Sequence, residues 1–432
     1  MMGPVQHSTL VSGGSLRIPI RTLALLCVLT MAASRPVRAQ TFSVIHTFSG
    51  GGDGYQPYAG LTVDSGGNLY GTTSEYVGGT VFKMKRVNGS WVLNTLLNFN
   101  GSNGLIPYSR VVFGAHGVLY GTTLEGGNSL SCEFGCGAVY SLRPPKTACK
   151  SVSCPWTATA IQSFTDGADG GNPNFVDPIF DQAGNLYGTT ALGGTAGIGV
   201  VFEMTESDGV WTETVIHNFS GPDGAYPYSG LISDGAGNFY GTTGYGGQFN
   251  EGTVYRLSPS GPGWTITTLY SFQGTTDGAH PSAALISDQS GNLYGSTVVG
   301  GSGGGGTVFE LSPSGGGWSF SLLASLVGTI TNDYYPGPFN ALAMDGAGSL
   351  YGAAFANGAH QDGSVFKLTP SNGSWTYTSL HDFTGGDDGG NPIGGVTFDT
   401  NGNLYGTTTF GGMQGGENCY TEGCGTVWEI TP

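Results

Sequence analysis

The chain has 432 residues, of which 80 are glycine, and 10% of its residues are charged while 12% are aromatic. This composition suits many short strands joined by tight turns, and it excludes a disordered chain, which is poor in aromatic residues. The net charge of −16 and the 13 scattered Lys and Arg residues also argue against nucleic acid as a partner, because phosphate binding needs clustered basic side chains.

The first 39 residues have the pattern of a signal peptide. Arg17 and Arg21 precede an apolar stretch at residues 23–33, and a short cleavage motif ends at Ala39. The apolar stretch is shorter than the roughly 20 residues that a membrane-spanning helix needs, and no later stretch is long enough. We therefore expect cleavage near Ala39 and release of a soluble, monomeric protein into the periplasm or the medium. Cleavage there removes four arginines and no acid, which changes the charge from −16 to −20.

Seven segments share the sequence Leu-Tyr-Gly-Thr-Thr or a close variant. The spacings between their tyrosines are 50, 67, 53, 54, 57 and 54 residues, and the tyrosines are Tyr70, Tyr120, Tyr187, Tyr240, Tyr294, Tyr351 and Tyr405. A period of this length with four strand signals is typical of a β-propeller, in which one repeat cannot bury its faces alone. The sequence therefore predicts an all-β fold, a seven-bladed β-propeller of four-stranded antiparallel blades, as a single domain over residues 40–432.

The fourth copy shows how the four strand signals follow one another. A tryptophan strand at residues 211–219 comes first, then a Leu/Ile run near Leu231, a third strand at 239–243 and a fourth at 252–257. The tight turn at 258–263 makes the fourth strand and the next tryptophan strand antiparallel neighbours in one blade. We therefore expect the Leu/Ile run to be the innermost strand of each blade and the tryptophan strand the outermost.

The two ends of the mature chain complement each other. Residues 41–48 match only a tryptophan-type strand, whereas the chain stops after a fourth-strand signal at 425–430. We expect residues 41–48 to form the outer strand of the last blade, because this closes the ring and removes an exposed strand edge.

The repeated sequence Asp-x-x-Gly-Asn-Leu-Tyr-Gly-Thr-Thr-x-x-Gly-Gly, followed by Gly-Thr-Val-Phe-x-Leu, resembles the GloVer (Gloeobacter–Verrucomicrobia) tandem repeat of exported bacterial proteins. The resemblance covers essentially all of residues 41–432. The second and third strand signals are also similar to NHL-type propeller repeats, at residues 61–64 and 68–70. These resemblances imply architecture and export, and they assign no activity to any position.

Six cysteines follow the leader, in three close pairs: Cys132/Cys136, Cys149/Cys154 and Cys419/Cys424. An even number, export and short spacing favour three disulfides. The alternative is a zinc site formed by the first four of these cysteines, which we disfavour because exported cysteines usually oxidise. We expect no metal and no cofactor.

Strand directions place two sets of loops on one face: the Asp-Gly-x-x-Pro loops and the glycine-rich loops after Gly-Thr-Thr. Such a face is the usual place for ligands in a propeller. The first set carries an acid or amide four residues before the proline position, at Asp53, Asn103, Asp169, Asp223, Asp277, Asn332 and Asp388. Asp53, Asp223 and Asp277 are candidate ligand-binding residues, although Asp or Asn before Gly is also what a repeated Asx-turn requires.

Aromatic residues beside the loop prolines are more selective. Tyr58, Tyr108 and Tyr228 follow a proline in only some copies, and His280 precedes one. Tyrosine offers a flat apolar face with a polar tip, which suits stacking on a sugar ring or gripping a peptide. These four residues are therefore candidates for ligand binding, and packing between blades is the alternative.

No arrangement of nucleophile and base is visible in the sequence. We expect a secreted, non-catalytic binding or scaffold protein that recognises a glycan, a peptide or a protein partner through its loop face. The alternative is a carbohydrate-active hydrolase or lyase with two carboxylates at the channel mouth, since only three-dimensional proximity would single out two of the 29 acids.

Overall fold

The computed structural model describes residues 40–74, 78–145, 156–328, 335–412, 419 and 422–432. Thr41–Thr431 forms one compact unit. The expected signal peptide, Cys149, Cys154 and Asn332 lie outside the described residues. Within the part of the chain that is described, no helix has the length and apolar character that a membrane span requires.

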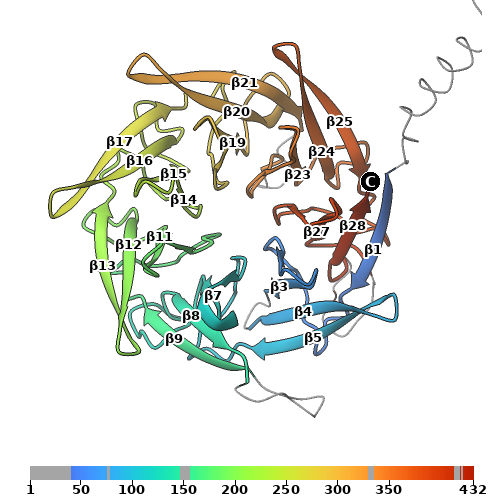
Figure 1. Cartoon of the computed structure of the whole chain (residues 1–432), viewed down its shortest axis with the longest axis horizontal. Helices are drawn as coiled ribbons and strands as arrows, with labels where there is room; N and C mark the ends of the chain where they lie inside the picture. Colours follow the sequence, from blue (N-terminus) through green and yellow to red (C-terminus); the bar gives the residue numbers. More distant parts are fainter. Residues whose placement is uncertain (1–39, 75–77, 146–155, 329–334, 413–418, 420–421) are drawn as a thin grey trace, which may run out of the picture. The chain divides into compact units, whose positions relative to one another are not determined.

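Seven four-stranded antiparallel sheets form a ring, which confirms the predicted seven-bladed β-propeller (Figure 1). The innermost strands have two residues each: β2 (Thr62–Val63), β6 (Val112–Phe113), β10 (Ile179–Phe180), β14 (Ile232–Ser233), β18 (Ile286–Ser287), β22 (Ala343–Met344) and β26 (Thr397–Phe398). The second strands carry the Leu-Tyr-Gly-Thr-Thr sequence: β3 (Leu69–Thr73), β7 (Leu119–Thr123), β11 (Leu186–Thr190), β15 (Phe239–Thr243), β19 (Leu293–Thr297), β23 (Leu350–Ala354) and β27 (Leu404–Thr408).

The two remaining layers lie toward the outside of the ring. The third strands are β4 (Thr80–Val87), β8 (Ala138–Arg143), β12 (Val200–Ser207), β16 (Thr253–Ser260), β20 (Gly304–Ser314), β24 (Ser364–Ser371) and β28 (Thr426–Thr431). The outer strands are β5 (Ser90–Asn98), β9 (Thr157–Ser163), β13 (Val210–Asn218), β17 (Gly263–Ser271), β21 (Gly317–Val327), β25 (Ser374–Asp382) and β1 (Thr41–Thr47). We number the blades 1 to 7 from the blade that begins with β2, so the tryptophan strand is outermost, as predicted.

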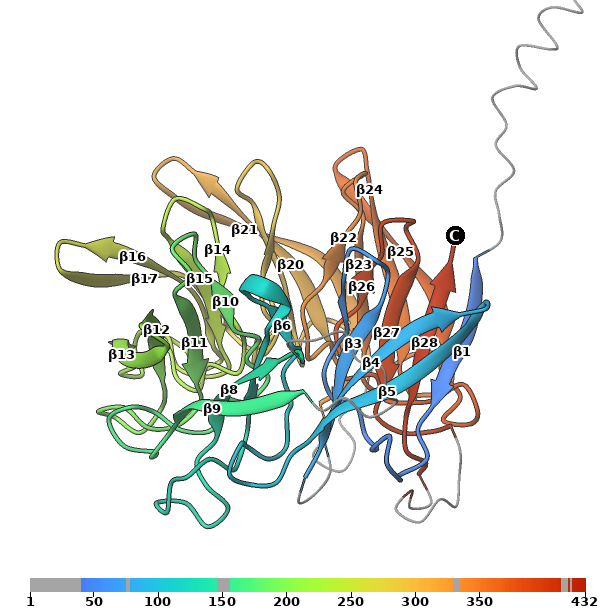
Figure 2. The same cartoon turned by 60° about the horizontal axis from the view of Figure 1, so that its bottom comes forward.

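The N-terminal strand closes the ring. β1 pairs antiparallel with β28, from Thr41 opposite Thr431 to Thr47 opposite Thr426, and blade 7 has the order β26-β27-β28-β1. Both views show the blue strand β1 lying along the red strand β28 (Figures 1 and 2). The prediction for residues 41–48 is therefore confirmed, and Phe48, at the end of this segment, is fully buried.

The glycine of each Leu-Tyr-Gly-Thr-Thr segment makes room for an aromatic ring of the third strand. Gly71 pairs with Phe82, and a Cβ atom on Gly71 would lie 2.5 Å from the end of that ring. All seven blades have this pairing, with Phe, Tyr or Trp opposite the glycine, as in Gly406 opposite Trp428. Any larger residue would displace a ring from the packed core, which explains why the glycine recurs.

The threonines of the same segment tie one blade to the next. The Thr72 hydroxyl in blade 1 donates to backbone carbonyl oxygens at the entrance to blade 2, 3.0 Å from that of Pro107 and 3.2 Å from that of Ser109. Equivalent bonds come from Thr122, Thr189, Thr242 and Thr407. These hydroxyls are buried, so the bonds satisfy backbone carbonyls that water cannot reach.

The short Asp-x-x-Gly-Asn turns link the innermost strand to the second strand. Asp64 accepts hydrogen bonds from the backbone N–H groups of Gly66 and Asn68, from the Asn68 amide and from the Tyr70 hydroxyl. Burial alone raises the pKa of Asp64, but these hydrogen bonds outweigh burial and lower its pKa. Blade 2 lacks this aspartate and has the 3₁₀ helix η1 (Ala115–Gly117) in the turn instead.

Candidate functional site

Two sets of loops meet on one face of the ring, which we call the loop face. In blades 2, 3, 4, 5 and 7, the loop that enters the blade pairs with the loop after the second strand through an isolated bridge, such as Ala225 with Tyr245 and Ala279 with Val299. The prediction that these loop sets share a face is therefore confirmed. The opposite face, with the Asp-x-x-Gly-Asn turns and the hairpins between third and outer strands, is called the turn face.

The residue before the loop proline has an unusual backbone conformation. It has a positive φ in six blades: 53° at Gln56, 57° at Ile106, 52° at Asn172, 53° at Tyr226, 55° at His280 and 53° at Asn391. Its N–H donates to a loop of the preceding blade and its carbonyl accepts from its own blade. Tyr226, for example, donates to Ile198 and accepts from Gly244. These positions are held between two blades, so their side chains are well placed to vary without altering the scaffold.

The candidate aspartates are engaged within their own loops. Asp53 accepts from Ser49 and lies 3.2 Å from the His46 ring nitrogen. Asp223 accepts from Ser220 and lies 2.9 Å from the His217 ring nitrogen. These contacts are the ones that a turn-forming role predicts.

Asp277 is bound in the same way, with one difference. Its Oδ2 atom accepts from the Tyr270 hydroxyl and from the backbone N–H of Gln273, both at 2.9 Å. Its Oδ1 atom is buried without a hydrogen-bond partner among the described residues.

Tyr58 and Tyr108 lie together in an aromatic cluster near the innermost strands. Their ring centroids are 4.6 Å apart, and Tyr108 stacks on Phe175 at 5.1 Å. Tyr58 and Phe175 also pack against a buried group from blades 6 and 7 that includes Phe355 and Ile393. Residues from blades 1, 2, 3, 6 and 7 therefore meet in this cluster, which supports the packing alternative for these two tyrosines.

Tyr228 and His280 belong to a different cluster, over blades 4 to 6. It consists of Tyr226, Tyr228, Tyr245, Glu251, His280 and Tyr335, and we call it the tyrosine site. Neighbouring rings are in contact: the centroid distances are 6.2 Å for Tyr226–Tyr228, 5.7 Å for Tyr226–Tyr245, 4.4 Å for Tyr245–His280 and 5.6 Å for His280–Tyr335. All six side chains are partly buried.

His280 is oriented by the backbone of blade 4. Its Nδ1 atom lies 2.8 Å from the carbonyl oxygen of Gly244, so this nitrogen carries the proton. Its Nε2 atom lies 3.6 Å from the Glu251 carboxylate. Asn172 and Asn391, at the equivalent places in blades 3 and 7, donate their side-chain amides to the matching carbonyls of Leu124 and Phe355.

The phenol groups of Tyr228 and Tyr245 stay protonated at neutral pH. A hydrogen bond with Tyr335, burial and the nearby Glu251 charge raise the pKa of Tyr245. Burial, with smaller contributions from Tyr226 and Tyr335, raises the pKa of Tyr228. The site therefore offers neutral O–H donors, flat rings and one carboxylate, a combination that suits hydrogen bonding and stacking.

Sequence reasoning selected Tyr228 and His280 but overlooked Tyr245 and Glu251. Both lie in the glycine-rich loop of blade 4, and the bridge from Tyr245 to Ala225 brings this loop beside the proline loop. An available signal was the tyrosine after Gly244. The described loops of blades 2, 3, 5 and 7 have Glu125, Leu192, Val299 and Phe410 at this place.

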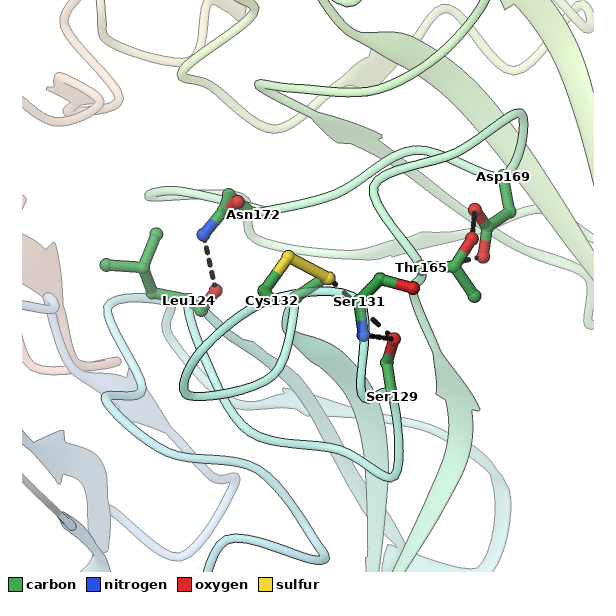
Figure 3. Close-up of a disulfide and its surroundings, with 8 residues drawn as sticks. Leu124, Ser129, Ser131, Cys132, Thr165, Asp169 and Asn172 are labelled. Atoms are coloured by element: carbon green, nitrogen blue, oxygen red, sulfur yellow. Dashed lines mark hydrogen bonds between the residues drawn. A yellow bond between two sulfur atoms is a disulfide. The ribbon is translucent and has the colours of Figure 1, made fainter.

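Two of the three predicted disulfides are confirmed. Cys132 is bonded to Cys136 and Cys419 to Cys424, with Cα atoms 5.3 and 4.8 Å apart. Figure 3 shows the first of them beside the loop that carries Asp169 and Asn172. Since Cys132 and Cys136 are bonded to each other, they are not ligands of the alternative zinc site. Disulfides are typical of oxidising compartments outside the cytoplasm.

The ring of seven repeated blades defines the chain as a tandem-repeat β-propeller. The family model described as the Gloeobacter/Verrucomicrobia repeat matches residues 129–338 and 288–432, and the chain belongs to this family. No curated protein sequence matches the chain.

Solved structures of other propellers are similar in fold at low sequence identity. A putative 6-phosphogluconolactonase from Bacteroides uniformis is 14% identical with a TM-score of 0.50, over 80% of this chain and 96% of its own. A luciferin-regenerating enzyme is 13% identical with a TM-score of 0.42, over 91% and 95%. A protein of unknown function from Dyadobacter fermentans is 9% identical with a TM-score of 0.46, over 91% and 99%. The structure of the putative 6-phosphogluconolactonase supports the fold of this chain and gives no evidence of its activity.

Proposed function

We propose that this chain is an exported, non-catalytic binding protein that recognises a glycan through the tyrosine site. The signal-peptide pattern that ends at Ala39 and the two disulfides support export. In this proposal Tyr228 and His280 contact the ligand, whereas Tyr58 and Tyr108 support the loops from the neighbouring cluster.

The observation that carries the proposal is the asymmetry of the tyrosine site. Three of its members, Tyr226, His280 and Tyr335, stand before the loop proline of blades 4 to 6. The same position holds Gln56, Ile106, Asn172 and Asn391 in the other blades. Seven copies of one scaffold need no such difference for folding, so a cluster confined to three blades is better explained by recognition. Tyrosine rings stack on the apolar faces of sugars, while their hydroxyl groups and Glu251 can bond sugar hydroxyls.

A glycan panel tests this proposal. We expect one class of soluble glycan to raise the melting temperature of the mature protein, and we expect Tyr245→Ala and Tyr335→Ala to abolish that shift. Tyr108→Ala is the matched control, because it removes a tyrosine from the neighbouring cluster on the same face. Loss of binding in Tyr108→Ala with full binding in Tyr245→Ala would contradict the proposal.

One observation favours the alternative of a carbohydrate-active enzyme. Glu213 stands two residues after a tryptophan, where the other tryptophan strands have Leu93, Ala158, Ile266, Phe320 and Tyr377. Burial, together with the charge of Asp169, raises the pKa of Glu213 to about 7. A carboxylic acid with a raised pKa near a second carboxylate is a pattern found in glycosidases, although Glu213 lies on the outer strand β13 and not at the channel mouth. A reducing-sugar assay on the same panel, repeated with Glu213→Gln, distinguishes this enzyme from a binding protein.

A further inference from the structure

Three neighbouring grooves lie on the turn face, away from the tyrosine site. The largest, of about 620 Å³, lies between blades 3 and 4 and contains Tyr187, Phe239 and Trp264. A groove of about 440 Å³ between blades 2 and 3 contains Tyr120 and Trp211. A groove of about 300 Å³ between blades 4 and 5 contains Tyr240.

The grooves are adjacent because they share walls. The turn that begins Asp181-Gln182-Ala183 lines both the first and the second groove, and Ser233 lines both the first and the third. A ligand that leaves one groove over such a turn enters the next. The three grooves therefore suit an extended chain better than a compact molecule.

The central groove has an aromatic wall. Trp264 and Phe180 are partly exposed in it, whereas Tyr187 and Phe239 are buried. The ring centroids of Tyr187 and Phe239 are 4.3 Å apart, and Trp264 lies 5.8 Å from Phe239 and 6.1 Å from Tyr187. Phe239 replaces the leucine that begins the second strand in the other six copies. This one substitution adds a third ring to the Tyr–Trp contact that other blade junctions also have, as between Tyr294 and Trp375.

Some polar side chains at the groove are held by hydrogen bonds within the protein, and one is available to bind a ligand. The Tyr187 hydroxyl lies 2.7 Å from Glu203 and 3.2 Å from Asp181, which holds its ring in place. Asp181 itself is engaged by the N–H groups of its own turn. Gln182, by contrast, is exposed, and its amide has no hydrogen-bond partner in the described part of the chain. It lies at the boundary of two grooves, where it can donate to and accept from a ligand.

The acidic lining of the grooves indicates which kind of extended polymer can bind there. Their linings contain Asp181, Glu206, Asp234 and Asp288, and neither Lys nor Arg. Acidic walls repel polyanions, whereas stacked rings with a neutral amide suit a chain of neutral sugars.

We propose that the turn face over blades 2 to 5 is a second binding site, which takes an extended neutral glycan chain whose successive sugar rings enter the three grooves. This site is separate from the tyrosine site and does not depend on the function proposed for it. Two sites on opposite faces would let one protein link two glycan chains.

Titration calorimetry with neutral β-1,4-linked gluco-, xylo- and manno-oligosaccharides of two to six units tests this site. We expect the affinity of at least one series to rise about tenfold from the dimer to the hexamer, because added units reach further grooves. Trp264→Ala should weaken hexamer binding about tenfold through lost stacking. Gln182→Ala should also weaken it, and this exposed position cannot disturb the fold.

Trp375→Ala is the matched control, since it removes the equivalent ring between blades 5 and 6, and it should leave hexamer binding unchanged. Phe239→Leu restores the residue of the other copies, so it should fold normally. It should bind several-fold more weakly, because the buried Phe239 ring contacts the partly exposed Trp264 and supports it. Tyr245→Ala, on the loop face, should leave turn-face binding intact, which separates a failure of this proposal from a failure of the tyrosine site. Equal losses in Trp264→Ala and Trp375→Ala, tighter binding of polygalacturonate, or no binding by any of the three series would overturn the proposal.

Discussion

The hydroxyl of Thr407 in blade 7 donates a hydrogen bond to the carbonyl oxygen of Ala59 in blade 1, at 3.0 Å. These residues are 348 positions apart in the chain, and both are buried. The bond is the same blade-to-blade contact that Thr72 makes from blade 1 to blade 2. Here it joins the last blade to the first, so it completes the ring on the inner side while β1 completes it on the outer side.

Thr407→Val should therefore lower the free energy of unfolding by about 1–2 kcal/mol, because it leaves a buried carbonyl unpaired. Ser296 provides the control. It occupies the equivalent place in blade 5, but its buried hydroxyl has no partner among the described residues. Ser296→Ala should leave stability unchanged or raise it, and urea unfolding measures both. A loss in Ser296→Ala as large as that in Thr407→Val would contradict this account.

A second prediction concerns β1. A protein that begins at Gly50 lacks the outer strand of blade 7 and the fully buried Phe48, so it should melt at a much lower temperature than one that begins at Gln40. Differential scanning calorimetry of the two proteins is the measurement. An unchanged melting temperature would show that ring closure by β1 adds no stability.

The mature protein should have no free thiol before reduction. Two disulfides are formed in the structure, and we predict a third between Cys149 and Cys154. Titration with Ellman's reagent in denaturant should give no reaction without a reductant and six thiols after it. Two reactive thiols in the unreduced protein would show that the third pair is open.

Glu213 should make stability depend on pH. Burial raises its pKa in the folded state to about 7 from the usual 4.5, so the folded state favours the protonated side chain. The ionised form is therefore unfavourable in the folded state, and this cost grows as the pH rises from about 4.5 to about 7. Because the side chain is partly exposed, we expect a cost of only about 1 kcal/mol at pH 8.

Glu213→Gln removes this cost. The variant should match the parent protein at pH 4 and be the more stable of the two at pH 8, as measured by urea unfolding at both values. Glu206→Gln, at an exposed position of the same blade, is the control for a general effect of charge. An equal difference between parent and Glu213→Gln at both pH values would mean that Glu213 ionises normally.

One pair of interacting residues recurs in several repeats and shows what the local sequence can predict. The loop aspartate is accompanied by a hydrogen-bonding partner in the outer strand, as in His46–Asp53, His217–Asp223, Tyr270–Asp277 and His381–Asp388. Where the loop has Asn103, the matching strand residue is Leu97. This pairing is visible in the sequence once the repeats are aligned, because the two residues lie only six or seven positions apart.

Repetition made the architecture predictable from sequence alone. Seven copies of one segment have the same strand pattern. The order of strands in a blade, the outer position of the tryptophan strand and the closing role of residues 41–48 therefore followed from the repeat period and the loop lengths. The tyrosine site and the turn-face grooves did not follow, because they join residues of neighbouring blades whose separation in the chain says nothing about their distance. Tyr245 contacts His280 and Trp264 contacts Tyr187 only because the ring sets each blade against the next. Blade packing, together with the left-handed backbone conformation before the loop prolines, determines which side chains meet in the tyrosine site and in the turn-face grooves. No local sequence pattern encodes these contacts between blades.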